Sequence, residues 1–220
     1  MTTMIKTILA CTCALAVTAC GPLNEGNVAS GALTALTARL GGAAPAPAPA
    51  GPVLTPDQVA ANPNGFLVMN AYGGSLVTAL AAAAQNGDRT TFLSPDGLSV
   101  TTQNGVMVAS RGFPRDLMAA DVDATMQALI AEGGAATRIH ETLSGTDQIV
   151  RQTFACTVAS QGRETIRIMG REIGTEVFGE TCQSDRLAFT NRYWISDAGR
   201  MVRSLQAIAP ESGYVQLDRP

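Results

Sequence analysis

Five cysteines and a single histidine are the side chains of this sequence that most readily suggest chemistry. Cys20 ends the run LAVTAC, which resembles a bacterial lipobox. A short cationic start containing Lys6 and an apolar stretch over residues 7–19 precede it, as in a secretory signal peptide, and the stretch is too short to span a membrane. A lipobox cysteine becomes the acylated first residue of the mature protein, and each acyl chain contributes about 0.8 kcal/mol per buried methylene to membrane binding. We therefore predict a signal peptide over residues 1–19 and a lipid anchor at Cys20.

Two earlier cysteines are weaker candidates for the same modification. Residues 8–11 (ILAC) also resemble a lipobox, but the apolar run before Cys11 is short and is interrupted by Lys6. A signal-peptide core needs roughly 7–15 apolar residues. Cys13 follows a threonine and fits less well. The alternatives to lipidation at Cys20 are an uncleaved anchor and an ordinary signal peptide.

The residue after Cys20 bears on the membrane that receives the protein. Gly21 stands where an Asp marks inner-membrane retention in enteric bacteria. We therefore expect a protein anchored in outer-membrane lipid through Cys20, with its domain facing the periplasm.

The two remaining cysteines, Cys156 and Cys182, would face an oxidising periplasm in an exported bacterial protein. A disulfide is the expected state of such a pair. By closing the loop between the two cysteines, the disulfide would stabilise the folded state by about 3 kcal/mol in the chain-entropy model. A metal site is the alternative, but it lacks neighbouring ligands, because His140 is the only histidine and no CxxC spacing occurs. We predict no metal and no cofactor.

The other titratable side chains suggest no catalytic constellation. His140 alternates with Ile139 in a strand-like stretch, so we interpret it as a strand-surface residue rather than a catalytic base. The carboxylates Asp116, Asp121 and Asp123 resemble caps or solvated faces. We also expect Asp116 to form a structural ion pair with Arg111 and Arg115. The sequence therefore favours a protein that is not an enzyme.

Binding of a sugar is the better functional hypothesis for the polar and aromatic residues. Aromatic faces stack on sugar C–H groups, and arginines such as Arg111 and Arg192 can hold an acidic sugar by bidentate hydrogen bonds. Tyr193 and Trp194 are adjacent, so strand alternation places them on opposite faces and at least one belongs to the core. For Trp194 we favour core packing over ligand contact.

Composition excludes one class of partner. The chain has 15 Lys and Arg against 18 Asp and Glu, a formal net charge of −3. Nucleic-acid binding needs a basic patch to neutralise phosphates, and the scattered arginines do not form one. We predict no nucleic-acid partner.

Two segments follow the signal peptide. Residues 20–52 are rich in small residues and contain AAPAPAPAGP, which cannot form a helix or sheet ladder and favours extended polyproline II. We interpret this segment as a lipidated tether. Residues 53–220 are long enough for one domain with a sizeable core.

We predict that the domain is mainly β. A helix is expected from Thr55, where TPDQ has a cap, a proline at the first position and a capping-box Gln. Helices are also expected over residues 114–120 and 123–132, while residues 76–84 favour helix by propensity but suit a strand by context. Turn sequences such as PDG and NG separate short apolar runs. These runs are residues 66–71, 90–93, 98–102, 106–110, 137–143, 149–159, 165–169, 175–182, 189–196, 201–209 and 214–217. We predict an antiparallel meander curled into a half-barrel or barrel, with a few short helices.

Three stretches together resemble the YjbF family of lipoproteins, which includes the group 4 capsule lipoprotein GfcB. The first is NGVMVASRGFPRDL over residues 104–117, which contains Arg111 and Asp116. The second is the spaced pair FAC and ETC, which ends in Cys156 and Cys182. The third is NRYWIS over residues 191–196, followed by Gly199, SLQ over residues 204–206 and Pro210. From these stretches we take Arg111, Asp116, Arg192, Tyr193, Trp194 and Gln206 as candidate contacts with a ligand or partner. Leu205 stands before Gln206 where the family pattern has an arginine, which weakens any role assigned to the side chain at position 205.

The resemblance implies a mostly antiparallel β fold and a non-catalytic role in exporting an extracellular or capsular polysaccharide, as a scaffold or periplasmic guide. It also implies two kinds of partner, an outer-membrane β-barrel protein and a periplasmic export protein. The alternatives are a periplasmic polysaccharide-modifying enzyme and a lipid or lipoprotein carrier, because half-barrels can enclose acyl chains.

Overall fold

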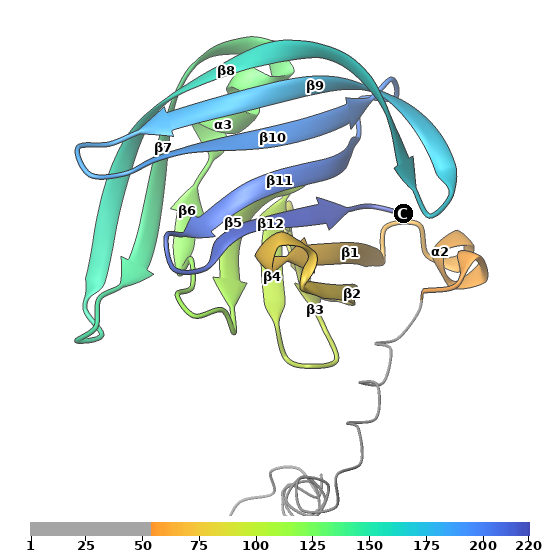
Figure 1. The fold of residues 1–220 in the computed structure, drawn as a ribbon, viewed down its shortest axis with the longest axis horizontal. Helices are drawn as coiled ribbons and strands as arrows, with labels where there is room; N and C mark the ends of the chain where they lie inside the picture. Colours follow the sequence, from red (N-terminus) through yellow and green to blue (C-terminus); the bar gives the residue numbers. More distant parts are fainter. Residues whose placement is uncertain (1–53) are drawn as a thin grey trace, which may run out of the picture. The chain divides into compact units, whose positions relative to one another are not determined.

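Short strands joined by tight turns build a single antiparallel sheet in the computed structural model of this chain, which describes residues 54–220 (Figure 1). The predicted signal peptide, Cys20 and the tether lie outside the described residues. Twelve strands pair in the order β5-β4-β3-β2-β1-β12-β11-β10-β9-β8-β7-β6. Their bounds are β1 (Phe66–Ala71), β2 (Leu76–Asn86), β3 (Arg89–Leu93), β4 (Ser99–Gln103), β5 (Val106–Arg111), β6 (Ala119–Asp121), β7 (Gly133–Leu143), β8 (Ile149–Ile168), β9 (Arg171–Gln183), β10 (Ala188–Ser196), β11 (Met201–Ala209) and β12 (Gly213–Asp218).

The sheet curls into a nearly closed barrel, so the predicted meander and fold class are confirmed. The first and last strands, β1 and β12, pair with each other, and the seam lies instead between β5 and β6. Hydrogen bonds from Ser110 N to Leu117 O (2.8 Å) and from Met118 N to Glu141 O (2.8 Å) tie the connecting loop across that seam.

Helical elements are few and short. They are α2 (Pro56–Ala61), α3 (Asp123–Ile130) and a 3₁₀ turn, η1 (Tyr72–Gly74). Thr55 caps α2 with the full capping box that the sequence predicts. Among residues 54–220, no helix combines the length and apolar character needed to cross a membrane.

Two local predictions differ from the structure. The helix expected over residues 114–120 is wrong, because Asp116 accepts hydrogen bonds from Gly112 N (3.0 Å) and Phe113 N (3.2 Å) and so holds a turn, after which β6 pairs with β7. The runs at 149–159 and 165–169 belong to one strand, β8, which continues through a bulge between Ser160 and Gly162. Residues 76–84 adopt the strand alternative, paired on both sides by β1 and β3.

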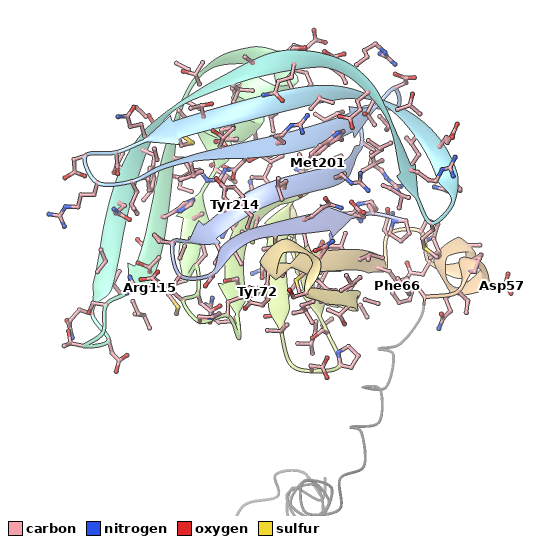
Figure 2. The ribbon with its side chains drawn as sticks, in the orientation of Figure 1. Asp57, Phe66, Tyr72, Arg115, Met201 and Tyr214 are labelled. Atoms are coloured by element: carbon pink, nitrogen blue, oxygen red, sulfur yellow. A yellow bond between two sulfur atoms is a disulfide. The ribbon has the colours of Figure 1, made fainter. Side chains whose placement is uncertain are left out.

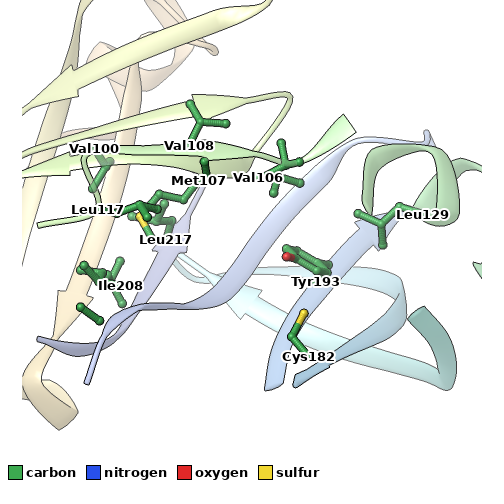
Figure 3. Close-up of a cluster of buried hydrophobic side chains, with 14 of the residues drawn as sticks. Val100, Val106, Met107, Val108, Leu117, Leu129, Cys182, Tyr193, Ile208 and Leu217 are labelled. Atoms are coloured by element: carbon green, nitrogen blue, oxygen red, sulfur yellow. The ribbon is translucent and has the colours of Figure 1, made fainter. Parts of the chain in front are cut away.

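The antiparallel order gives the barrel two distinct ends. The α3 end carries α3 and the β2–β3, β4–β5, β8–β9 and β10–β11 turns, whereas the loop end carries the β1–β2, β3–β4, β7–β8, β9–β10 and β11–β12 turns. Inward-facing side chains form the main core, part of which is shown in Figure 3. A second cluster contains Trp194, Ile166, Ile168, Val177 and Val202. Because Tyr193 lies in the main core and Trp194 in the second cluster, the two clusters occupy opposite faces of β10.

Candidate functional site

A buried ion pair occupies the interior of the barrel. Arg138 on β7 and Glu180 on β9 lie 2.9 Å apart between Nη1 and Oε2, and both side chains are fully buried. Strand alternation turns each of them inward among apolar neighbours. Such a pair is costly to desolvate, so its stability depends on further hydrogen bonds to each partner.

Glu180 receives those bonds from three side chains on two other elements. Thr125 Oγ1 on α3 donates at 2.6 Å, Tyr193 OH at 2.6 Å and Asn191 Nδ2 at 2.7 Å, the last two from β10. Burial alone would raise the pKa of Glu180, but the charge of Arg138 and these donors outweigh burial and lower it. An ionised carboxylate held by four donors is a structural acceptor, not a general base.

Arg138 connects the pair to the rest of the interior. Its guanidinium donates to His140 Nε2 (2.8 Å), Tyr193 OH (3.2 Å) and Met107 O (3.2 Å). Burial opposes its charge, but Tyr193 and Glu180 raise the pKa of Arg138 above its usual value. The arginine therefore crosses the interior from β7 to β5 and stays charged.

His140 lies inside the barrel, so its interpretation as a strand-surface residue is wrong. It is 5% exposed and stacks on Phe189, with ring centroids 5.4 Å apart. Burial, with the nearby charge of Arg138, lowers the pKa of His140 to about 3. Since Arg138 Nε can only donate, His140 Nε2 must be the acceptor and the ring proton resides on Nδ1. The predicted strand is present here, and only the face assigned to His140 is wrong.

Between pH 6.5 and 5, acid should therefore destabilise the fold through His140. An unfolded histidine binds a proton below about pH 6.5, whereas folded His140 does not until near pH 3, so stability is complete above pH 6.5 and falls below it. We expect a loss of about 2 kcal/mol between pH 6.5 and 5, from about 1.4 kcal/mol per pH unit. Urea unfolding at a series of pH values measures it. The matched variant His140→Gln should show a flat profile over the same interval, and equal slopes in the two proteins would contradict the assignment.

Gln206 and Tyr193, both predicted as ligand contacts, lie in the same interior. Gln206 Oε1 accepts from Met107 N (2.8 Å), and its Nε2 donates to Ser204 Oγ (2.8 Å) and Gly105 O (3.0 Å). Both side chains are fully buried, and burial raises the pKa of Tyr193. The structure therefore places these two residues where they join β11 and β10 to β5 and β9, away from any surface ligand.

The expected disulfide between Cys156 and Cys182 is present. The two residues are direct partners in the pairing of β8 with β9. Their sulfurs lie near Glu180, and the three residues have the spacing of a metal site. Both thiols are consumed in the disulfide and Glu180 is held by its four donors, so these residues do not form one.

Arg192 and Trp194 lie together on the outer face of the sheet. The Arg192 guanidinium sits 4.7 Å from the Trp194 ring centroid, and Trp194 Nε1 donates to Glu164 Oε2 (3.0 Å). Trp194 is 5% exposed, which agrees with the packing role that the sequence favours. A sugar could not stack on this ring without displacing Arg192.

Arg111 and Asp116 belong to the loop at the β5–β6 seam. Arg111 donates to the carbonyl oxygens of Leu117 (3.1 Å) and Met118 (3.3 Å), and Asp116 accepts from Ser110 Oγ (2.9 Å). The predicted ion pair of Asp116 with Arg111 and Arg115 is wrong: within residues 54–220, Arg115 pairs with Glu211 instead (3.2 Å). The loop turns back on itself, so these side chains satisfy backbone groups at the seam rather than one another.

A wide hollow opens at the α3 end of the barrel, and we call it the α3-end hollow. It measures about 1260 Å³ and is lined by residues from the ends of many strands, including Asn104, Glu132, Asp197, Arg200, Met201 and Arg219. Met201 marks its position in Figure 2. Its lining mixes polar and charged residues with apolar ones such as Met126, Leu129 and Phe178.

Two arginines of the α3-end hollow lack acidic partners in the described part of the chain. Arg163 pairs with Asp197, but Arg200 and Arg219 form no salt bridge within residues 54–220. Burial, together with the charge of Arg200, lowers the pKa of Arg219. The two guanidiniums therefore repel each other, and an anion placed between them would relieve that repulsion.

Sequence reasoning missed Arg138, Glu180, Arg200 and Arg219. The first two carry no distinguishing signal, because an inward and an outward charged residue look the same in a strand whose register is unknown. The last two become neighbours only when the β10–β11 turn and the end of β12 meet. The resemblance did single out Asn191 and Gln206, which the structure places in the interior network.

Comparisons with known proteins agree with this architecture. The family model described as group 4 capsule polysaccharide lipoprotein gfcB, YjbF matches residues 34–219. A similar crystal structure is that of the hypothetical lipoprotein YmcC from Escherichia coli K12, with a TM-score of 0.61, 19% identity, and coverage of 70% of this chain and 84% of that one. At that identity the likeness shows the fold alone. A comparison with curated proteins gave no match.

Proposed function

Because this chain belongs to the YjbF family of group 4 capsule polysaccharide lipoproteins, we propose that it assists the export or assembly of an extracellular or capsular polysaccharide. In this proposal Cys20 anchors the protein in the outer membrane, and the barrel faces the periplasm as a non-catalytic scaffold or guide. The proposed partners are the polymer itself, an outer-membrane β-barrel protein and a periplasmic export protein.

The burial of the ionisable groups inside the barrel supports a binding role rather than a catalytic one. Three ionisable groups of the interior, Arg138, Glu180 and Tyr193, are hydrogen-bonded to one another and fully buried. A general acid or base must reach its substrate within about 3 Å. These groups cannot do so without opening the barrel.

The single observation that favours contact with a polymer is the pair Arg200 and Arg219 in the α3-end hollow. Guanidinium groups hold carboxylates through charge-assisted, often bidentate hydrogen bonds. The hollow is open and wide, so a polysaccharide could pass across it while one of its acidic groups contacts the two arginines. The proposed substrate class is therefore an acidic polysaccharide, bound at the α3 end.

Binding of an acidic polymer by the mature chain tests this contact. Arg200→Gln with Arg219→Gln should weaken binding of polygalacturonate about tenfold for each charge-assisted bond removed, measured by titration calorimetry. The matched control is Arg151→Gln with Arg167→Gln, because both of these arginines are exposed and neither lines the hollow. Equal losses in the two double variants would indicate general charge attraction and would count against the site.

Deletion of the gene tests the cellular role. A deletion strain should lose or alter its surface polysaccharide, and the wild-type gene should restore it. The Arg200→Gln, Arg219→Gln gene should restore less than the control double variant does. An unchanged glycan coat in the deletion strain would refute the proposed function.

A further inference from the structure

The sheet splits between β10 and β11 at the loop end of the barrel. The two strands are paired only from Arg192–Leu205 to Ile195–Met201, whereas Ala188 to Asn191 pair with β9 alone. Side chains take over the missing contacts: Asn191 Oδ1 accepts from Ala207 N (2.9 Å), and Tyr214 OH accepts from Thr190 N (3.1 Å). The first bond joins β10 to β11 and the second joins β10 to β12, so β10 stays linked to its neighbours while the backbone ladder between β10 and β11 is open at this end.

A pocket of about 450 Å³ lies at this opening, and we call it the β10–β11 slot. Its volume is within the range of small-molecule sites, roughly 300–1,000 Å³. Its walls are mostly apolar or aromatic, and they include Phe154, Leu187, Phe189, Ile208 and Tyr214. Phe154 and Ile208 are buried core residues, whereas Tyr214 is 40% exposed, so the slot connects the core with the surface. Tyr214 and Arg115 are labelled in Figure 2.

A polar donor faces the inner part of the slot. His140 lines it, and the hydrogen bond from Arg138 Nε to His140 Nε2 leaves the ring proton on Nδ1. Nδ1 has no hydrogen-bond partner within residues 54–220. Gln103 Oε1 is the only side-chain polar atom in that range that is both fully buried and without a partner, so Nδ1 is not fully buried. His140 Nδ1 is therefore open to the slot, and it offers one N–H to an oxygen of a bound molecule.

The charged side chains that line the β10–β11 slot are positive. Arg115 and Arg186 line the slot, and no Asp or Glu lines it in the described part of the chain. Both arginines have exposed partners outside it: Arg115 Nε lies 3.2 Å from Glu211, and Arg186 Nε lies 3.5 Å from Asp185. Exposed pairs of this kind are weak, so either guanidinium can turn to an anionic ligand at little cost.

We propose that the β10–β11 slot binds a single-chain acidic lipid, with its acyl chain against the aromatic walls, its anionic head at Arg115 and Arg186, and an ester oxygen accepting from His140 Nδ1. The apolar walls favour hydrocarbon over a sugar, because a sugar ring carries several hydroxyl groups and each needs a polar partner. The inference does not rest on the proposed function, since the slot and the α3-end hollow share no residues.

The test uses the mature chain carrying Cys20→Ala, so that its own acyl groups do not compete. We expect 1-oleoyl-lysophosphatidate to bind with 1:1 stoichiometry in native mass spectrometry and calorimetry. Monooleoylglycerol, which lacks the charge, should bind about tenfold more weakly for each arginine hydrogen bond that it cannot form, and glycerol phosphate, which lacks the chain, should not bind measurably.

Three variants locate the site. Ala207 lines the slot, so Ala207→Phe adds a phenyl ring at its wall while keeping the backbone N–H that donates to Asn191 Oδ1, and it should weaken lipid binding at least tenfold. The matched control is Ala155→Phe, an exposed alanine of β8 outside the slot, which should bind as the parent does. Arg115→Gln with Arg186→Gln should weaken binding of lysophosphatidate but not of monooleoylglycerol.

Several results would overturn the proposal, provided near-UV circular dichroism shows native packing in each variant. They are undiminished lysophosphatidate binding by Ala207→Phe, equal losses in Ala207→Phe and Ala155→Phe, and the absence of saturable 1:1 binding. Binding of galacturonate in the slot with the affinity of the lipid would assign the slot to a sugar instead.

Discussion

Glu180→Gln should lower the free energy of unfolding by about 3–5 kcal/mol, the usual cost of removing one partner of a buried ion pair. Arg138 would keep its charge in the interior with no anion beside it. This is costly because both side chains are fully buried. The carboxylate accepts hydrogen bonds from Arg138, Thr125, Tyr193 and Asn191 on its two oxygens. The amide of glutamine has only one acceptor oxygen, so it could not accept all four. Urea denaturation followed by circular dichroism measures the loss.

Glu172→Gln is the matched control for this prediction. It makes the same chemical change at the exposed pair Arg167–Glu172, where both side chains are more than 60% exposed. Surface pairs contribute about 0–1 kcal/mol, so the control should stay within that range. The double variant Arg138→Met, Glu180→Met should recover part of the loss, because no buried charge remains. A Glu180→Gln variant as stable as Glu172→Gln would show that the interior pair contributes no more than a surface pair.

Cys20→Ala should move the protein from the membrane fraction to the soluble periplasmic fraction almost completely. An acyl chain contributes about 0.8 kcal/mol per buried methylene, so losing two or three chains removes the whole proposed anchor. Immunoblots of fractionated cells, with outer and inner membranes separated by density, measure both the anchoring and the proposed outer-membrane destination.

Cys13→Ala is the control for the anchoring prediction. Cys13 belongs to the predicted signal peptide and should be dispensable, so this variant should remain in the membrane fraction. A Cys20→Ala protein that still incorporated a labelled fatty acid would refute lipidation at Cys20. A Cys13→Ala or Cys11→Ala protein that became soluble would assign the modification to the earlier residue.

Much of the fold could be predicted because its signals are local. The turns at Pro95-Asp96-Gly97 and Asn104-Gly105 need residues that tolerate positive φ, and Gly97 (85°), Asn104 (51°) and Gly105 (97°) adopt it. The start of α2 lies in four consecutive residues, TPDQ. Such elements depend on near neighbours, so a single sequence contains nearly all the information that determines them.

The errors arose where the inward or outward face of a strand, or a specific side-chain hydrogen bond, decides the structure. His140 alternates correctly with Ile139, but the alternation alone does not say which face is inside. The segment at 114–120 has acceptable helix propensity, yet Asp116 finds its donors in Gly112 and Phe113, and Leu117 N finds Ser110 Oγ at 3.0 Å across the seam. These contacts outweigh a propensity of a few tenths of a kcal/mol per residue.

The sequence by itself determined the strand-and-turn plan, the cysteine pair and the resemblance to one lipoprotein family, because each depends on residue type and on spacing along the chain. Only the tertiary structure decided that Arg138 and Glu180 meet inside the barrel, that Arg200 and Arg219 face the same hollow, and that β10 parts from β11 to leave a slot. The physical reason is closure: curling the sheet until its two edge strands, β5 and β6, meet at the seam assigns every strand an inside and an outside. That assignment couples all twelve strands at once, and no local pattern contains it.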